Sequence, residues 1–239
     1  MLNNGARGLF MSRRVVTTVA VAATLAVFCP PGQAGPRDAR ETCNLVTDPS
    51  GDAYTTVVDN GADLDITGGD VGMDQRTLTA VIRLDELTKP AVTPTSGRMY
   101  EFNFSANGKN FIMRAILVPG GEDYDYQAFI SDQPASDKSA GDGGRPRTHS
   151  GIGALYGTVD ERAREVRISG PLSLFRKHAS FDKTTLSNLA VVTYSVQGYN
   201  PETTPQLTEG SLGSGGIVDK AFSPKEYRPY APSCATRRR

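Results

Sequence analysis

Alternation of apolar and polar side chains with a period of two recurs along this chain and restricts its fold more than any other feature. The clearest example is residues 78–84, in which every second side chain is aliphatic. The pattern returns in residues 98–118 on both sides of Asn107-Gly108, a dipeptide that favours a tight hairpin turn. Strands with one face in a core produce this alternation. The sequence therefore predicts a strand followed by a β-hairpin.

Further strand candidates follow one another with Gly, Pro, Asp and Asn between them. They are residues 54–58, 64–68, 126–130, 152–159, 165–169 and 189–196. Helical signals are restricted to one or two turns within residues 180–189, and residues 131–150 and 199–216 have the composition of long surface loops. Short strands at this spacing predict an all-β fold, an antiparallel β-sandwich of jelly-roll or immunoglobulin-like topology.

The first 34 residues have the organisation of a secretory signal peptide. Basic side chains precede an apolar run over residues 15–28, and no acidic residue occurs before Asp38. Small residues stand three and one positions before Gly35, as a signal peptidase requires. The apolar run is shorter than a membrane span needs. We therefore expect cleavage after Ala34 and a secreted, extracellular protein.

The exported part, residues 35–239, is expected to form one domain. Arg13-Arg14 leaves the twin-arginine export route open beside the general one. Lipidation at Cys29 is disfavoured because the bulky Phe28 precedes it. The whole chain balances 26 Lys and Arg against 26 Asp and Glu, which argues against nucleic acid as a partner. No other apolar run approaches the length of a membrane span, and we expect a monomer.

Two cysteines remain after removal of the signal, one near each end of the exported chain. Cys43 and Cys234 meet an oxidising environment on export, so a disulfide between them is the expected state. The chain has no CxxC or Cys/His spacing that would indicate metal or redox thiols. The disulfide requires that the two ends of the domain lie together.

Acidic residues gather near the start of the exported domain. Asp48 and Asp52 lie on either side of a turn that contains Gly51, and Asp65 and Asp70 follow within about twenty residues. Carboxylate oxygens in a turn-rich segment are the ligands that calcium takes. The four aspartates are therefore candidate calcium ligands. The alternative is that they cap turns or face water, and the spacing is not that of an EF-hand.

Short motifs link the chain to a known group of domains. The first of them are Cys43, Asp48-Pro49-Ser50-Gly51-Asp52, Leu64-Asp65-Ile66 and Leu78-Thr79-Ala80-Val81-Ile82-Arg83-Leu84. They resemble the opening of exported actinobacterial β-sandwich domains, which are similar to family-9 carbohydrate-binding modules and the DOMON-like group. Later motifs resemble the penultimate hairpin of that group: Gly157-Thr158-Val159-Asp160, Val166-Arg167-Ile168 and Gly170-Pro171-Leu172. The resemblance implies carbohydrate binding and a structural calcium at the early acidic turn.

The chain departs from the sugar-binding members of that group in having no Trp. Tyrosine is an alternative platform, because its ring is apolar and its hydroxyl is polar. Tyr124, Tyr126 and Tyr156 are the candidate ligand-binding residues, with Tyr199 as a further one. The alternative is that these tyrosines belong to the core or its rim.

Catalysis has weaker support in the sequence. His149 stands beside Ser150, but a catalytic triad is assembled only in space, and a solvated loop histidine explains the pair as well. Acid pairs such as Asp123 and Asp125 suit glycoside hydrolysis only at a defined separation. The preferred interpretation is a non-catalytic secreted module that binds a glycan or another cell-envelope component. A secreted hydrolase with loop carboxylates and a protein-interaction module remain the alternatives.

Overall fold

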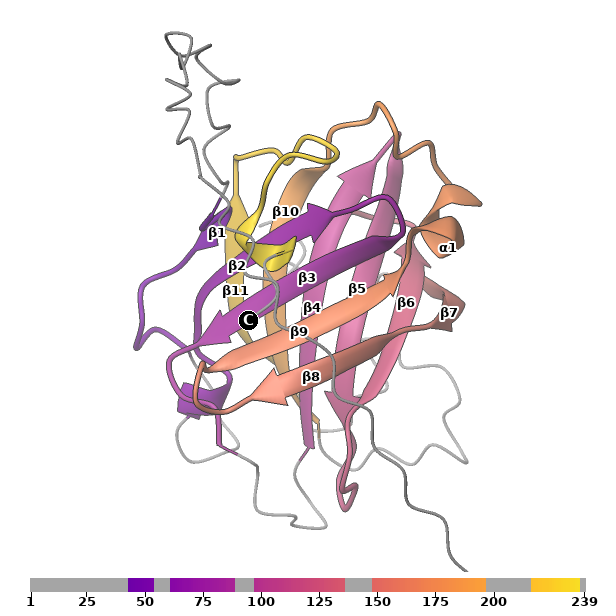
Figure 1. The fold of residues 1–239 in the computed structure, drawn as a ribbon. Coiled ribbons are helices and arrows are strands. Elements are labelled where there is room, and N and C mark those ends of the chain that lie inside the picture. Colours follow the sequence, from indigo (N-terminus) through magenta and orange to yellow (C-terminus); the bar gives the residue numbers. More distant parts are fainter. Residues whose placement is uncertain (1–42, 54–60, 89–96, 136–147, 197–215, 237–239) are drawn as a thin grey trace, which may run out of the picture. The chain divides into compact units, whose positions relative to one another are not determined.

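Two antiparallel sheets face each other in the computed structural model (Figure 1), which describes residues 43–53, 61–88, 97–135, 148–196 and 216–236. The five-stranded sheet contains, in spatial order, β1 (Val46–Thr47), β2 (Ile66–Met73), β3 (Thr77–Leu84), β9 (Glu165–Pro171) and β8 (Tyr156–Asp160). The six-stranded sheet contains β11 (Ile217–Ser223), β10 (Ser187–Val196), β4 (Gly97–Ala106), β5 (Lys109–Leu117), β6 (Asp125–Ser131) and β7 (His149–Ala154). The predicted β-sandwich is confirmed.

Helical structure is limited to short pieces within this framework. They are η1 (Gly61–Asp63), α1 (Leu172–Arg176) and η4 (Cys234–Thr236). In the described part of the chain, no helix combines the length and the apolar character needed to cross a membrane. The chain divides into two units, Met1–Asp38 and Ala39–Arg239, and every described residue belongs to the second. The predicted signal peptide lies outside the described residues.

The predicted hairpin is confirmed as β4 and β5. Asn107 (φ 50°) and Gly108 (φ 73°) both adopt positive φ, as a two-residue turn of this hand requires. Its inward side chains fill the space between the sheets, where Phe104 stacks on Phe111 with 5.3 Å between ring centroids. Phe175 of α1 meets Phe111 edge-on, so the short helix closes one end of this core.

Strand β10 of the six-stranded sheet carries apolar side chains on both of its faces. Leu189 and Val191 of β10 point into the core between the sheets. Val192, Tyr194 and Val196 alternate with them and form a separate buried cluster with Met99 and Ile116, among others. One strand therefore supplies two apolar faces.

Residues 152–159 form two strands, so the prediction of a single strand there is wrong. The chain leaves the six-stranded sheet after β7 and enters the five-stranded sheet as β8, with Leu155 between them. Gly153 assists this crossing, because a Cβ there would lie 2.8 Å from Leu174 Cδ1. The alternation changes phase at the crossing, because Ile152 and Leu155 both pack against the core three residues apart. A period of two does not reveal which neighbour a strand pairs with.

The helical turns expected in residues 180–189 are also misplaced. The described helix is α1, and β10 already begins at Ser187. Leu172 and Phe175 bury one side of a single helical turn, which is too short to show a helical period in the sequence. Residues 54–58 and most of residues 131–150 and 199–216 lie outside the described residues.

The Cys43–Cys234 disulfide is confirmed, with 5.2 Å between the two Cα atoms. It holds the C-terminal segment against the outer face of β2. Ser233 Oγ donates to Val71 O (2.8 Å), and the Tyr227 hydroxyl accepts the Met73 N–H (3.0 Å). Gly72 makes this approach possible, because a Cβ there would lie 2.8 Å from Ser233 Cβ. Both faces of β2 are therefore covered.

The disulfide is expected to carry much of the stability of the fold. It closes a loop with a sequence separation of 191 residues, and removal of such a constraint costs about 4 to 5 kcal/mol by chain entropy. A Cys43→Ser/Cys234→Ser variant should unfold at a clearly lower denaturant concentration than the oxidised protein. Denaturation with and without reductant measures this. Equal midpoints for oxidised protein, reduced protein and variant would refute the expectation.

Candidate functional site

Three carboxylates from distant parts of the chain converge at one edge of the sandwich. Asp48 and Asp52 lie between β1 and η1, and Asp219 lies in β11 of the other sheet. One oxygen from each lies within 4.8 Å of those from the other two. Asp219 also accepts the N–H of Ile66 at the start of β2 (2.7 Å). The cluster therefore joins the two sheets.

Asp65 borders this cluster from the start of β2. Its Oδ2 accepts the N–H of Gly51 in the turn between Asp48 and Asp52 (2.5 Å). Asp65 is 3 % exposed, and no described residue makes a well-formed hydrogen bond to its Oδ1. Asp48 Oδ2 is a second buried oxygen that receives no well-formed hydrogen bond from a described residue. Buried carboxylate oxygens are costly unless a donor or a cation meets them.

The electrostatics of the cluster reflect this excess of negative charge. Burial, with repulsion from Asp219, Asp52 and Asp65, raises the pKa of Asp48 to about 7. Burial also raises the pKa of Asp219 to about 6, although the N–H groups of Ile66 and Lys220 oppose the rise. The pKa of Asp65 is raised by burial, against the N–H groups of Gly51 and Ala53. The site thus favours a positive charge in its midst.

Other buried acids in the described residues are paired with arginine. Asp70, predicted as a fourth ligand, is fully buried and meets Arg83 at 2.7 Å while accepting the Leu45 N–H (2.9 Å). It therefore supports β2 and does not join the acidic cluster. Asp63 is similarly paired with Arg98 (2.6 Å).

Sequence patterns did not identify Asp219 as a member of this cluster. It stands 153 residues beyond Ile66, and the order of residues does not show that β11 lies beside the early acidic turn. The available signal was an acid in a short segment of mostly apolar residues, Val218 to Phe222, that also contains Lys220.

The raised pKa values predict a pH dependence in the absence of divalent cations. Carboxyl groups with folded pKa values of about 6 and 7 hold protons that the unfolded chain releases near the ordinary aspartate pKa of 3.8. The stability they contribute is present at low pH and is lost as the pH rises through the folded values. In EDTA, the melting temperature should therefore fall as the pH rises from about 4 to about 7 and then level off. A melting temperature that rises across this range would contradict the assignment.

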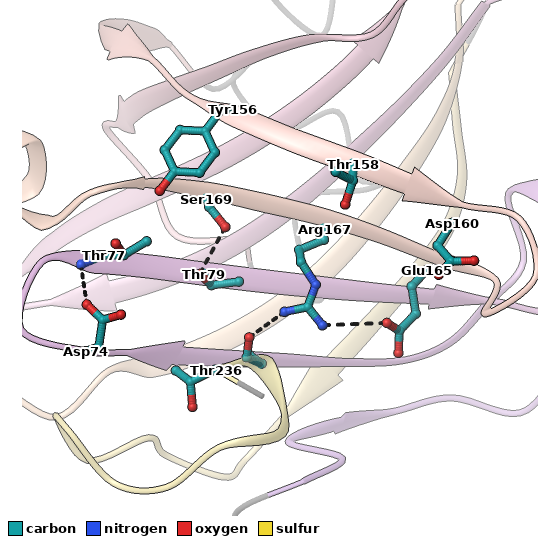
Figure 2. A pocket seen from close by; sticks show the side chains of 11 residues that line it. Asp74, Thr77, Thr79, Tyr156, Thr158, Asp160, Glu165, Arg167, Ser169 and Thr236 are labelled. Atoms are coloured by element: carbon teal, nitrogen blue, oxygen red, sulfur yellow. Dashed lines mark hydrogen bonds and ion pairs between the residues drawn. The ribbon is translucent and has the colours of Figure 1, made fainter. Parts of the chain in front are cut away.

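A second candidate site lies on the outer face of the five-stranded sheet (Figure 2). Strand register sets Tyr156 of β8 opposite Ser169 of β9, and Ser169 opposite Thr79 of β3. These strands form the floor of a groove of about 520 Å³. Ala235 and Thr236 of η4 form its wall, so the disulfide-bonded C-terminal segment bounds the groove.

Polar side chains cover the floor of this groove. The hydroxyls of Thr79 and Ser169 are 3.0 Å apart, and Arg167 donates to Ala235 O (2.5 Å), which ties the floor to the wall. Arg167 also lies 3.7 Å from Glu165. The described lining residues include three acids and one arginine, namely Asp74, Asp160, Glu165 and Arg167. The groove is therefore net negative and rich in hydrogen-bonding groups.

The three tyrosines predicted to bind ligand have different surroundings in the structure. Tyr156 is 56 % exposed and stands at the groove. Tyr124 packs between Tyr100 and Tyr126, at ring-centroid distances of 6.0 and 6.5 Å, and its hydroxyl is buried. Tyr126 packs against the core beneath Gly157, where a Cβ would lie 2.3 Å from its ring. Tyr156 alone of the three lines the groove, while Tyr199 lies outside the described residues.

The candidate catalytic residues His149 and Asp125 both contact other side chains of the six-stranded sheet. His149 Nδ1 lies 3.1 Å from Arg114, whose guanidinium is buried, pairs with Glu101 (2.5 Å) and covers the Phe129 ring at 4.3 Å. Asp125 accepts a hydrogen bond from Gln127 at the edge of β6 (2.6 Å). None of these described side chains lines the groove.

Comparison of the chain with protein-family models, with curated proteins and with solved structures gave no match. The resemblance to family-9 carbohydrate-binding modules and DOMON-like domains therefore stays a prediction.

Proposed function

We propose that this chain is a secreted, non-catalytic binding module that holds a neutral carbohydrate in the groove on its five-stranded sheet. The observation that carries the proposal is the exposed Tyr156 beside a floor of hydroxyl side chains. A sugar ring has an apolar face of C–H groups and a polar rim of hydroxyls. The tyrosine ring suits the first, and groups that donate and accept hydrogen bonds suit the second.

The charge of the groove narrows the ligand class. With Asp74, Asp160 and Glu165 against Arg167 in the lining, an anionic glycan would meet net repulsion at short range. Arg167 is already engaged by Ala235 O and Glu165, so little positive charge is left for a ligand carboxylate or phosphate. Neutral sugars, which bind through hydroxyls and stacking, fit this lining best.

Hydrolysis in the groove has less support. Glu165 lies opposite Asp160 across the β8–β9 pair, which brings two carboxylates near each other. Glu165 is 4 % exposed and is held by Arg83 (3.2 Å) and Arg167. An acid fixed in ion pairs is a poor proton donor to a leaving group. A binding role needs no such donor.

The Tyr156 platform can be tested with two substitutions. Tyr156→Ala should weaken binding of a neutral oligosaccharide at least about tenfold, because the apolar contact of one aromatic side chain is lost. Tyr156→Phe keeps the ring and should bind within a few fold of the original protein. Isothermal titration calorimetry with a panel of neutral oligosaccharides measures both. Retained affinity in the alanine variant would exclude this groove as the binding site. If no glycan binds and the protein instead captures another protein, the interaction module is favoured.

Calcium completes the proposal as a structural ion at Asp48, Asp52 and Asp219, with Asp65 as a further ligand. Hard carboxylate oxygens are the ligands that calcium prefers, and buried ones without donors provide coordination positions. An ion there would neutralise the repulsion within the cluster. It would also link the early acidic turn of one sheet to β11 of the other.

The calcium proposal predicts a change of sign in one variant. Calcium at about 100 times its dissociation constant should raise the melting temperature by about 5 to 10 °C over EDTA. Asp48→Asn should lower the melting temperature in calcium and raise it in EDTA above neutral pH, because it removes a ligand and a repulsive charge together and breaks no backbone hydrogen bond at the buried Oδ2. Asp125→Asn, a substitution of an exposed acid outside the cluster, is the matched control. Indifference of the original protein to calcium would refute the proposal.

A further inference from the structure

A second depression adjoins the groove at Asp74. This neighbouring surface of about 410 Å³ is lined by Met73, Asp74, Gln75 and Tyr230. Asp74 lines both cavities, and it lies in the turn between β2 and β3 at one end of the groove floor (Figure 2). The two cavities therefore adjoin at one side chain.

Each cavity contains an exposed aromatic ring. Tyr156 and Tyr230 are the two exposed large apolar side chains of the described residues, at 56 % and 41 %. Tyr230 arises from the segment between β11 and η4, far in sequence from the strands of the floor. The fold thus brings one tyrosine to each of two adjoining cavities.

The Tyr230 ring is held in place by its surroundings. Its hydroxyl donates to Asp182 Oδ1 (2.5 Å) and accepts from Arg176 (2.8 Å), and Arg176 also pairs with Asp182. Its backbone has φ 61°, a left-handed conformation that is strained for a residue with a bulky side chain. These contacts orient an exposed ring that has no apolar core to pack into. Such ordering before binding reduces the entropy that a ligand must overcome.

The length of the floor exceeds that of one sugar. The row from Tyr156 of β8 across β9 and β3 to β2 covers three strand spacings, about 14 Å. The depression beside Tyr230 extends this surface past the β2–β3 turn. A monosaccharide would leave most of it in contact with water.

We propose that the ligand is a neutral glycan chain of several units that stacks on both Tyr156 and Tyr230 and passes over Asp74 between them. This inference rests on the proposed function, because it takes carbohydrate as the ligand of the groove. The glycan crosses β9 and β3 with its hydroxyls over Ser169 and Thr79, which the strand register sets in one row with Tyr156. Asp74 accepts the N–H groups of Arg76 and Thr77 through Oδ1, which fixes its carboxylate and leaves Oδ2 to accept from a sugar hydroxyl.

Chain length and the second ring can be tested together by calorimetry. The probes are disaccharides and hexasaccharides derived from cellulose, xylan and chitin. The hexasaccharide of the preferred series should bind at least about tenfold more tightly than its disaccharide, since a second aromatic contact is gained. Tyr230→Gly should remove that advantage and leave disaccharide binding unchanged. Glycine accepts the positive φ, so this variant removes the ring without adding backbone strain.

Two controls separate the possible results. Tyr230→Phe keeps the ring and should keep most of the hexasaccharide advantage, whereas Tyr156→Ala should weaken both lengths. Equal affinities for both lengths, or a Tyr230→Gly variant that binds the hexasaccharide normally, would overturn the two-platform inference while groove binding stands. Absence of binding by every probe would overturn the proposed function and this inference together. Thermal unfolding of each variant confirms that it is folded.

Discussion

The closure of the chain ends over β2 is the constraint on which the rest of this structure depends. The disulfide fixes Cys43 beside η4, and Gly72 allows η4 to lie directly on the strand. After Cys43 the chain continues into the early acidic turn, which lies beside β11. Asp219 of β11 completes the carboxylate cluster there. On the other side of the disulfide, Ala235 and Thr236 form the wall of the groove. A single covalent link therefore supports both candidate sites, although they lie on different parts of the sandwich.

The distribution of buried charge distinguishes acids that are paired within the fold from those of the candidate cation site. Asp63, Asp70 and Glu101 each meet an arginine at hydrogen-bond distance, so their negative charges are balanced within the fold. Asp65 and Asp219 are also buried, yet in the described residues they meet backbone N–H groups and other acids. Backbone donors partly stabilise a carboxylate but do not cancel its repulsion with a neighbouring carboxylate. This contrast within one protein makes the cluster, rather than acidity in general, the argument for a cation.

The sequence predicted what depends on local pattern and failed where the answer depends on which elements are neighbours. The alternation predicted β3, β4 and β5, and Asn107-Gly108 predicted the turn between β4 and β5. Both signals are properties of adjacent residues. The crossing at Leu155 and the place of Asp219 were missed because both depend on pairing between distant strands. Asp70 was assigned to the metal from proximity in sequence, whereas its position on β2 directs it to Arg83. Of the three candidate tyrosines, strand register sets only Tyr156 at the groove.

The acidic cluster and the groove separate chemical groups that a glycosidase would need in one place. A general acid in a glycosidase requires a carboxyl group whose pKa is raised, and in this protein burial raises the pKa of Asp48 and Asp219. Neither residue lines the groove, where Glu165 is fixed by two arginines. The groove instead offers hydroxyls on rigid strands, a guanidinium that ties floor to wall, and an exposed ring. Rigid polar surfaces of this kind suit recognition, because their geometry is set before the ligand arrives.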